Sequence, residues 1–282
     1  MEAASPTVLK RWLAAELRQR RVAAGVTREQ AAAQVRGSVQ NIGHIENGRS
    51  LPGPLELERL LEFYGAGDRA EFWLGVRERA KRGKDWWAPF DGSLVPADRG
   101  LFLGLESSAT AIEGWDAQLV PDLLQTPEYA LAAIQGGTPG RTLPEVAGLV
   151  ELRMARQRVV LGGRAPVRRV VAESALRWQV GDREVLRSQL AHLVDVVRRP
   201  EVEVRVLPFA AGVAPTGSFD VLSFPEEVGD RTAVHVDTEV ADLHFEEPER
   251  VRRYRGALER LRDRALGPEE SVDYIRQVAA GS

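Results

Sequence analysis

Two neighbouring amides, Gln40 and Asn41, stand four and three residues before His44 in this sequence. A Gln or Asn amide both donates and accepts hydrogen bonds, so it can pair bidentately with adenine in the major groove of DNA. The spacing to His44 brings all three side chains to one side if the segment is helical. Base reading is therefore the chemistry that these residues suggest, and the flanking residues must build the helix that presents them.

Two short helices are expected around these amides. The first begins at Thr27, which has with Gln30 the spacing of a capping box. The second begins at Ser38, a favourable N-cap, and Ile42 and Ile45 give it an apolar inner side. The other side is left for a partner and carries Val39, Gln40, Asn41, Gly43 and His44. Arg28, Ser38 and Arg49 flank this surface and are expected to contact phosphates.

The segment resembles the helix-turn-helix of the XRE (lambda repressor/Cro-like) family, through Thr27, Ala32, Ser38, Ile42, Ile45, Glu46, Gly48 and Pro52. The resemblance implies that the helix near Ser38 is the recognition helix and that Arg28 touches phosphate. Arg28 stands where the family often has Gln, and Gly43 where it commonly has Ser. Glu46 is assigned to structure, as a carboxylate that ties the recognition helix to its neighbours.

Three further helices complete the predicted head. Residues 8–24 are amphipathic, residues 55–65 carry inward Leu side chains, and residues 68–81 begin with Asp68 as the expected N-cap. The head is predicted to span residues 1–82, followed by a linker at 83–99.

The charge distribution supports this division. The chain has 282 residues and a net charge of −3, yet residues 1–82 hold 14 Lys and Arg against 10 Asp and Glu, which leaves −7 for residues 83–282. A basic head on an acidic body is typical of a DNA-binding protein, because phosphates attract cations. The small excess in the head favours a homodimer on two half-sites of double-stranded DNA.

Composition restricts the compartment and the chemistry. The sequence has no cysteine, which excludes disulfides and cysteine nucleophiles. Neither an apolar run long enough to span a membrane nor a signal-peptide core is present, so we expect no membrane partner and a cytoplasmic, nucleoid-associated protein.

Residues 100–282 are predicted to form an α+β regulatory or partner-binding domain. Its helices are expected at 101–115, 143–161, 182–198, 248–265 and 268–279, and its strands, which alternate at period two, at 166–172, 202–207, 218–224 and 232–237. The predicted fold class is thus mostly α, with a five-helix lambda-repressor-like head followed by helices packed on a small mixed or antiparallel sheet.

This second part also carries a resemblance. The runs LGLESSAT, LRMARQRVV, ESALRWQVGD and SFDVLSFP, with Trp86 and Trp87, are similar to the domain of unknown function that follows the XRE head in many actinobacterial regulators, the WhiJ type included. The resemblance implies a transcriptional regulator, commonly encoded beside a small partner protein and described as antitoxin-like or developmental. It implies no catalytic residues.

Four apolar side chains are candidates for binding a ligand or a partner. Trp86 and Trp87 form an aromatic pair at the predicted boundary, which suits either an interface anchor or a packed linker. Phe209 and Val213 lie in a Gly- and Pro-rich loop between two strands, which suits either a cover over a ligand or a plain connection.

Catalysis and metal binding are not expected. His235 with Asp237, and His244 with Glu246, have the spacing of a two-ligand metal arm, but a site needs a third ligand. Ser107 and Ser108 lack the glycines of a nucleophile elbow. We therefore predict no cofactor, no metal and no enzymatic activity.

The sequence favours a DNA-binding transcriptional regulator, a dimeric repressor whose C-terminal domain senses a small protein encoded nearby or a small-molecule effector. The alternative is an antitoxin-like protein that sequesters a small partner and autoregulates its own operon.

Overall fold

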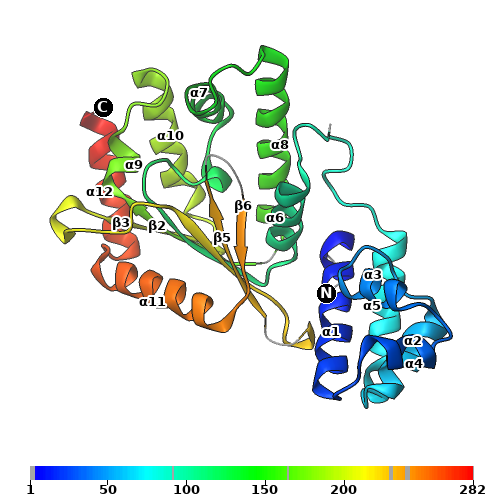
Figure 1. The fold of residues 1–282 in the computed structure, drawn as a ribbon. Helices are drawn as coiled ribbons and strands as arrows, with labels where there is room; N and C mark the ends of the chain where they lie inside the picture. Colours follow the sequence, from blue (N-terminus) through cyan, green and yellow to red (C-terminus); the bar gives the residue numbers. More distant parts are fainter. Residues whose placement is uncertain (1–3, 91, 164, 229–230, 239–241, 282) are drawn as a thin grey trace. The chain divides into compact units, whose positions relative to one another are not determined.

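A computed structural model describes residues 4–90, 92–163, 165–228, 231–238 and 242–281. The chain divides into two compact units, Met1–Ala88 and Pro89–Ser282, which we call unit 1 and unit 2. Each unit is described by itself (Figure 1).

Unit 1 is helical throughout. Its described residues form α1 (Pro6–Ala23), α2 (Arg28–Gln34), α3 (Val39–Glu46), α4 (Pro54–Phe63) and α5 (Ala70–Arg82), with a 3-10 turn η1 (Gly67–Arg69) before α5. The helices enclose a core that includes Trp12, Leu13, Ile42, Leu57 and Trp73. The predicted helical head is confirmed.

The helix ends of unit 1 follow from their caps. Thr27 Oγ1 accepts from Gln30 N at 3.3 Å and Gln30 Oε1 accepts from Thr27 N at 2.9 Å, which is the predicted capping box. Ser38 caps α3 by accepting from Asn41 N at 3.1 Å. The expectation for Asp68 is wrong, because α5 begins at Ala70 and Asp68 lies in the 3-10 turn before it.

Unit 2 is built on a six-stranded mixed sheet with strand order β3-β2-β1-β4-β5-β6. Its strands are β1 (Ala111–Asp116), β2 (Val167–Ala172), β3 (Val202–Leu207), β4 (Phe219–Ser223), β5 (Thr232–Asp237) and β6 (Asp242–Phe245). The three strands β1, β2 and β3 are parallel, whereas β4, β5 and β6 continue the sheet in antiparallel fashion from β1. The predicted mixed sheet is confirmed, and β1 is the strand at which its two halves meet.

Helices cover the sheet of unit 2. The described helices are α6 (Ala97–Ser108), α7 (Pro127–Gly137), α8 (Leu143–Gly162), α9 (Glu173–Arg177), α10 (Arg183–Val196), α11 (Pro248–Arg264) and α12 (Pro268–Gly281), with 3-10 turns η2 (Asp122–Leu124), η3 (Phe209–Ala211) and η4 (Glu226–Val228). Helix α11 crosses one face and contacts β1 to β5, and its Leu258 and Leu261 share a core with Trp115 and Phe219. Figure 1 shows α6, α7 and α8 on the other side of the sheet.

The predicted helix at 101–115 is wrong in its second half. Helix α6 ends at Ser108, and residues 111–116 form the central strand β1. The hydroxyls of Ser107 and Ser108 both donate to Gly104 O, at 3.2 and 2.7 Å, a local bond that weakens the end of a helix. Apolar residues at a spacing of four continue past this point, so periodicity alone did not reveal the change. Strand β6 was also missing from the sequence-based prediction.

Candidate functional site

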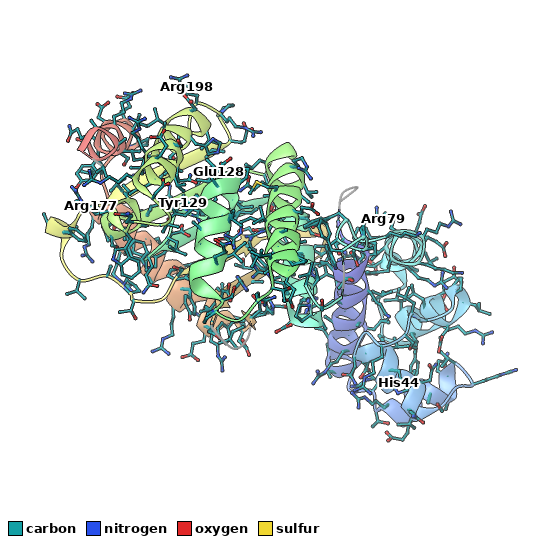
Figure 2. The ribbon with its side chains drawn as sticks, turned by 90° about the horizontal axis from the view of Figure 1, so that it is seen from above. His44, Arg79, Glu128, Tyr129, Arg177 and Arg198 are labelled. Carbon is teal, nitrogen blue, oxygen red and sulfur yellow. The ribbon has the colours of Figure 1, made fainter. Side chains whose placement is uncertain are left out.

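The surface of α3 is the first candidate site. Ile42 and Ile45 are buried against the rest of unit 1, whereas Gln40 is exposed and Val39 is 42 % exposed. His44 is half-buried on the same helix and is labelled in Figure 2. The structure thus brings Val39, Gln40, Gly43 and His44 together on the open part of a short capped helix. That is the arrangement that reading base edges requires.

A buried carboxylate fixes this helix. Glu46, 5 % exposed, accepts from Arg21 Nε of α1 and, at 2.8 Å, from Arg28 Nε of α2. Burial opposes the ionisation of Glu46, but the two guanidinium groups outweigh burial and lower its pKa. The structural role predicted for Glu46 is confirmed. Arg28 donates one N–H to Glu46. This bond fixes the position of the guanidinium group, which was predicted to contact phosphate.

Asn41 has an intramolecular partner that the sequence did not reveal. Its Nδ2 donates to Glu56 Oε1 of α4 at 2.8 Å, and the other oxygen of Glu56 accepts from Gly53 N at 3.0 Å. Glu56 therefore caps α4 and ties it to α3. Of the two predicted amides, Gln40 is the one that lies on the exposed face.

The turn between α2 and α3 contains a residue missed by sequence reasoning. Arg36 has a φ of 54°, which an L side chain rarely adopts, although Gly37 follows directly. Arg36 is exposed, as is Arg49 after the C-terminal end of α3. Two cations thus flank the exposed face, where DNA phosphates would lie.

Unit 2 contains a cavity of about 760 Å³, the second candidate site. It lies at the carboxyl end of β1, beside Asp116, and at the start of β4, beside Phe219 and Asp220. Strand β1 is parallel to β2 and antiparallel to β4, so its carboxyl end at Asp116 lies beside the amino-terminal end of β4.

Arg169 forms the sheet wall of this cavity. Its Nε and Nη2 donate to the two oxygens of Asp116 at 2.8 Å each, and its Nη1 donates to Asp220. The guanidinium crosses β1 at Gly114, where a Cβ would overlap it. Gly114 is therefore required by the position of Arg169. The sequence held a signal for this residue, because Arg169 stands between Val167 and Val171 on one face of a buried strand.

Three more arginines converge on Asp122 of η2. Arg156 donates to Asp122 at 3.1 Å and also to both oxygens of Glu106, at 2.6 and 2.7 Å. Arg153 Nη2 lies 3.2 Å from Asp122, and Arg99 Nη2 lies 4.0 Å from it. The ring of Phe102 lies under Arg99 and Arg156, which keeps both side chains against the wall.

His235 connects the antiparallel strands to this wall. Its Nε2 lies 2.6 Å from Asp242 and its Nδ1 3.3 Å from Asp220, while its ring stacks on Phe102. Burial lowers the pKa of His235, but the two carboxylates outweigh burial and raise it above the ordinary value. Its partners therefore come from neighbouring strands, and not from Asp237 on its own strand as the spacing suggested.

The carboxylates of the wall differ in acidity. Burial raises the pKa of Asp116 to about 6, although Arg169 opposes the change. Burial also opposes the ionisation of Asp220, but Arg169 and His235 outweigh it and hold the pKa of Asp220 well below the usual range. No group of three or more His, Cys, Asp or Glu within the described residues is arranged to hold a metal ion.

None of the four apolar candidates is among the described residues that line this cavity. Trp86 and Trp87 belong to unit 1, where their rings meet edge to face with centroids 5.6 Å apart. Phe209 and Val213 are 61 % and 92 % exposed, and neither is among the described residues that line the cavity. Their loop is held by Arg264, which donates to the carbonyl oxygens of Ala211 and Val213. The same loop reaches the cavity through residues 216–218.

Unit 1 thus contains two short capped helices, with Gln40 exposed on the second helix and Glu46 buried behind it. This is the arrangement of a helix-turn-helix DNA-binding protein. Residues 12–72 match a helix-turn-helix domain, which marks the chain as a DNA-binding regulator. Residues 100–277 match the domain of unknown function DUF5753, and the chain belongs to this family. No curated protein and no solved structure matches the chain. None of the described helices is both long and apolar enough to cross a bilayer.

Proposed function

We propose that the protein is a sequence-specific transcriptional repressor of the XRE type, acting on the nucleoid as a homodimer. The observation that carries the proposal is the exposed Gln40 on α3, a helix fixed from behind by Glu46. Gln40 reads a base edge, with Val39, Gly43 and His44 beside it. Arg28, Ser38 and Arg49 position the head on phosphates.

Arg36 joins these phosphate contacts. A left-handed conformation is unfavourable for any residue with a Cβ, by about 1 kcal/mol or more. A phosphate partner would explain why this position carries a cation and not Gly, which adopts the same conformation freely. The homodimer places two such heads on half-sites about one helical turn apart.

The C-terminal domain, of the type found in WhiJ-like actinobacterial regulators, receives the signal that controls DNA binding. The cavity beside Asp116 supports a small-molecule effector. A second candidate function, an antitoxin-like protein that sequesters a small protein encoded nearby, is favoured by the exposed Phe209 and Val213, because large apolar side chains on a surface mark interaction sites.

We also propose that the chain is not an enzyme. Both ring nitrogens of His235 face carboxylates, and the hydroxyls of Ser107 and Ser108 are used to bond the end of α6. These hydrogen bonds give His235, Ser107 and Ser108 structural roles.

Binding to genomic DNA fragments tests the proposal. The parent chain is expected to select a short inverted repeat, and Gln40→Ala is expected to lose about 1 to 3 kcal/mol of binding free energy at one base of each half-site. The exposed Gln19 on α1 provides a matched control, since Gln19→Ala removes the same side chain outside α3. A parent chain that selects no motif, or a Gln40→Ala variant that binds as the parent does, contradicts the proposed reading surface.

Asn41→Ala separates base reading from helix positioning. Because Asn41 donates to Glu56, its loss is expected to lower the free energy of unfolding by about 1 kcal/mol and to weaken binding to all sequences alike. A change of preference at one base without a change of stability would instead assign Asn41 to the groove.

A further inference from the structure

The cavity of unit 2 has the dimensions of a ligand site. Its volume of about 760 Å³ lies within the ~300 to 1,000 Å³ of small-molecule pockets. Charged groups seldom line an empty interior, because their removal from water is costly. Five arginines line this volume, and four of them, Arg99, Arg153, Arg156 and Arg169, are paired with carboxylates in its wall, so their presence calls for a chemical reason.

The arginines of the wall differ in how far their donors are used. A guanidinium carries five N–H donors. Arg156 and Arg169 each use all three nitrogens and are 7 % and 6 % exposed. Within the described residues, the side chain of Arg153, 16 % exposed, makes one hydrogen bond, to Gln125, and one ion pair, with Asp122 at 3.2 Å. The side chain of Arg99, 21 % exposed, makes one hydrogen bond, to Asp242 at 3.1 Å.

Most of the buried acceptors of the wall, by contrast, are occupied. Both oxygens of Asp116, Asp220 and Glu106 accept from Arg169, His235 or Arg156. Asp122 is shared among three arginines. Asp237 lies 3.6 Å from Arg99 Nη1, but its side chain is 63 % exposed, so it holds Arg99 weakly. Within the described residues, the wall therefore has a surplus of guanidinium donors beside Asp122.

The rest of the lining includes polar residues such as Gln118, Thr138 and Ser218, and it also has an apolar part. Leu103, Leu152 and Ile134 are buried at the cavity, and Leu119 and Leu149 extend this surface. The apolar residues come from α6, α7, α8 and the segment before η2, so they surround the volume next to the arginines. A ligand that fills the cavity thus has a charged end and an apolar body.

We propose that this cavity binds a small organic acid, with its carboxylate between Arg99 and Arg153 and its apolar body against Leu103, Ile134 and Leu152. The inference rests on the proposed function, in which unit 2 receives a signal, and names the class of molecule that carries it. The guanidinium groups of Arg99 and Arg153 both lie near Asp122, so they can donate paired hydrogen bonds to one carboxylate and match its charge. Burial lowers the pKa of Arg153, more than Asp122 raises it, and a carboxylate bound beside its guanidinium would oppose this shift.

Titration calorimetry of the full chain with octanoate and with phenylacetate tests the inference. At least one of the two is expected to bind saturably with one site per chain. Octylamine, with the same body as octanoate and the opposite charge, is expected not to bind. Arg153→Gln and Arg99→Gln are each expected to weaken binding at least tenfold, because each removes a charged hydrogen-bond donor from the carboxylate.

Three controls keep the result interpretable. Arg187→Gln removes an exposed cation of α10 that lies outside the cavity lining, and it should bind as the parent does. Arg153→Lys keeps the charge without the fork and should fall between parent and Arg153→Gln. Thermal unfolding by circular dichroism verifies that each variant is folded.

The outcomes separate this inference from the proposed function. Binding of neither acid, equal binding by Arg153→Gln, or binding of octylamine as tight as that of octanoate overturns the organic-acid site, whatever the DNA result. DNA binding is measured on the same samples by fluorescence anisotropy. Acid binding without any selected DNA motif overturns the repressor function and leaves the cavity assignment standing.

Discussion

Each unit of the molecule contains a buried cluster of charges, and the two clusters differ in what they enclose. In unit 1, Glu46 joins Arg21 and Arg28 and the cluster closes around one carboxylate. In unit 2, five arginines, six aspartates and His235 line a cavity of about 760 Å³. The first cluster positions helices, whereas the second leaves donors facing a volume. Buried charge is therefore a sign of ligand binding only where donors remain beside an open space.

The largest effect is expected from a substitution that breaks the charge cluster of unit 1. Glu46→Ala leaves two guanidinium groups without their shared carboxylate and is expected to lower the free energy of unfolding by about 3 kcal/mol. DNA binding should be lost with it, because α3 is no longer fixed. Urea unfolding followed by tryptophan fluorescence measures the effect. The exposed Glu62 provides the control, and a Glu46→Ala variant as stable as Glu62→Ala would remove the locking role.

Gly114→Ala is the corresponding change in unit 2. The added methyl group would overlap the guanidinium of Arg169, so we expect a loss of about 2 kcal/mol in the stability of this unit. DNA binding should remain, in contrast to the first variant. Differential scanning calorimetry, with Gly136→Ala as the control at a glycine with open space, measures the difference. A wild-type unfolding temperature for Gly114→Ala would mean that Arg169 can lie elsewhere.

Gly43→Ala separates the stability of unit 1 from its affinity for DNA. A Cβ at Gly43 meets no atom within 4 Å, so the substitution is expected to stabilise unit 1 by up to about 1 kcal/mol. We expect DNA affinity to fall nevertheless, because Gly43 lies on the exposed face with Gln40. Parallel unfolding and DNA-binding titrations distinguish the two quantities. Unchanged DNA affinity in the stabilised variant would show that Gly43 does not serve to bring the backbone of α3 close to DNA.

The last expected effect is a dependence on pH in unit 2. The pKa of His235 is raised in the folded chain, so its stabilising contribution is complete below its ordinary pKa near 6.5 and is lost as pH rises through the folded value. Asp220 and Asp242 face its ring nitrogens, and His244 stacks at 5.2 Å. The parent should lose stability relative to His235→Asn as pH rises above about 6.5. Parallel pH profiles for both chains would assign the dependence to other groups.

Local sequence predicted unit 1 well. Thr27, Gln30 and Ser38 act through bonds that span three residues, so their capping roles are legible in the sequence. The pairing of Asn41 with Glu56 was not predicted, because it depends on how α4 packs beside α3.

The site of unit 2 could not be predicted in the same way. Arg99, Arg153, Arg156 and Arg169 come from three separate elements, and their meeting depends on the register of β1 with β2 and β4. Without β1, whose residues read as a continuation of α6, no arrangement of the other strands brings Asp116 beside Arg169. His235 was considered only with Asp237, as an incomplete metal arm, whereas its partners Asp220 and Asp242 lie on neighbouring strands.

The contact of Arg169 with Asp116 and Asp220 also affects the rate at which unit 2 unfolds. Asp116, Arg169 and Asp220 are paired only when β1, β2 and β4 have assembled from distant parts of the chain. We expect these long-range bonds to form after the transition state for folding, so that their loss speeds unfolding more than it slows folding. We therefore expect Arg169 to lengthen the lifetime of the native sheet while leaving the speed of its formation almost unchanged.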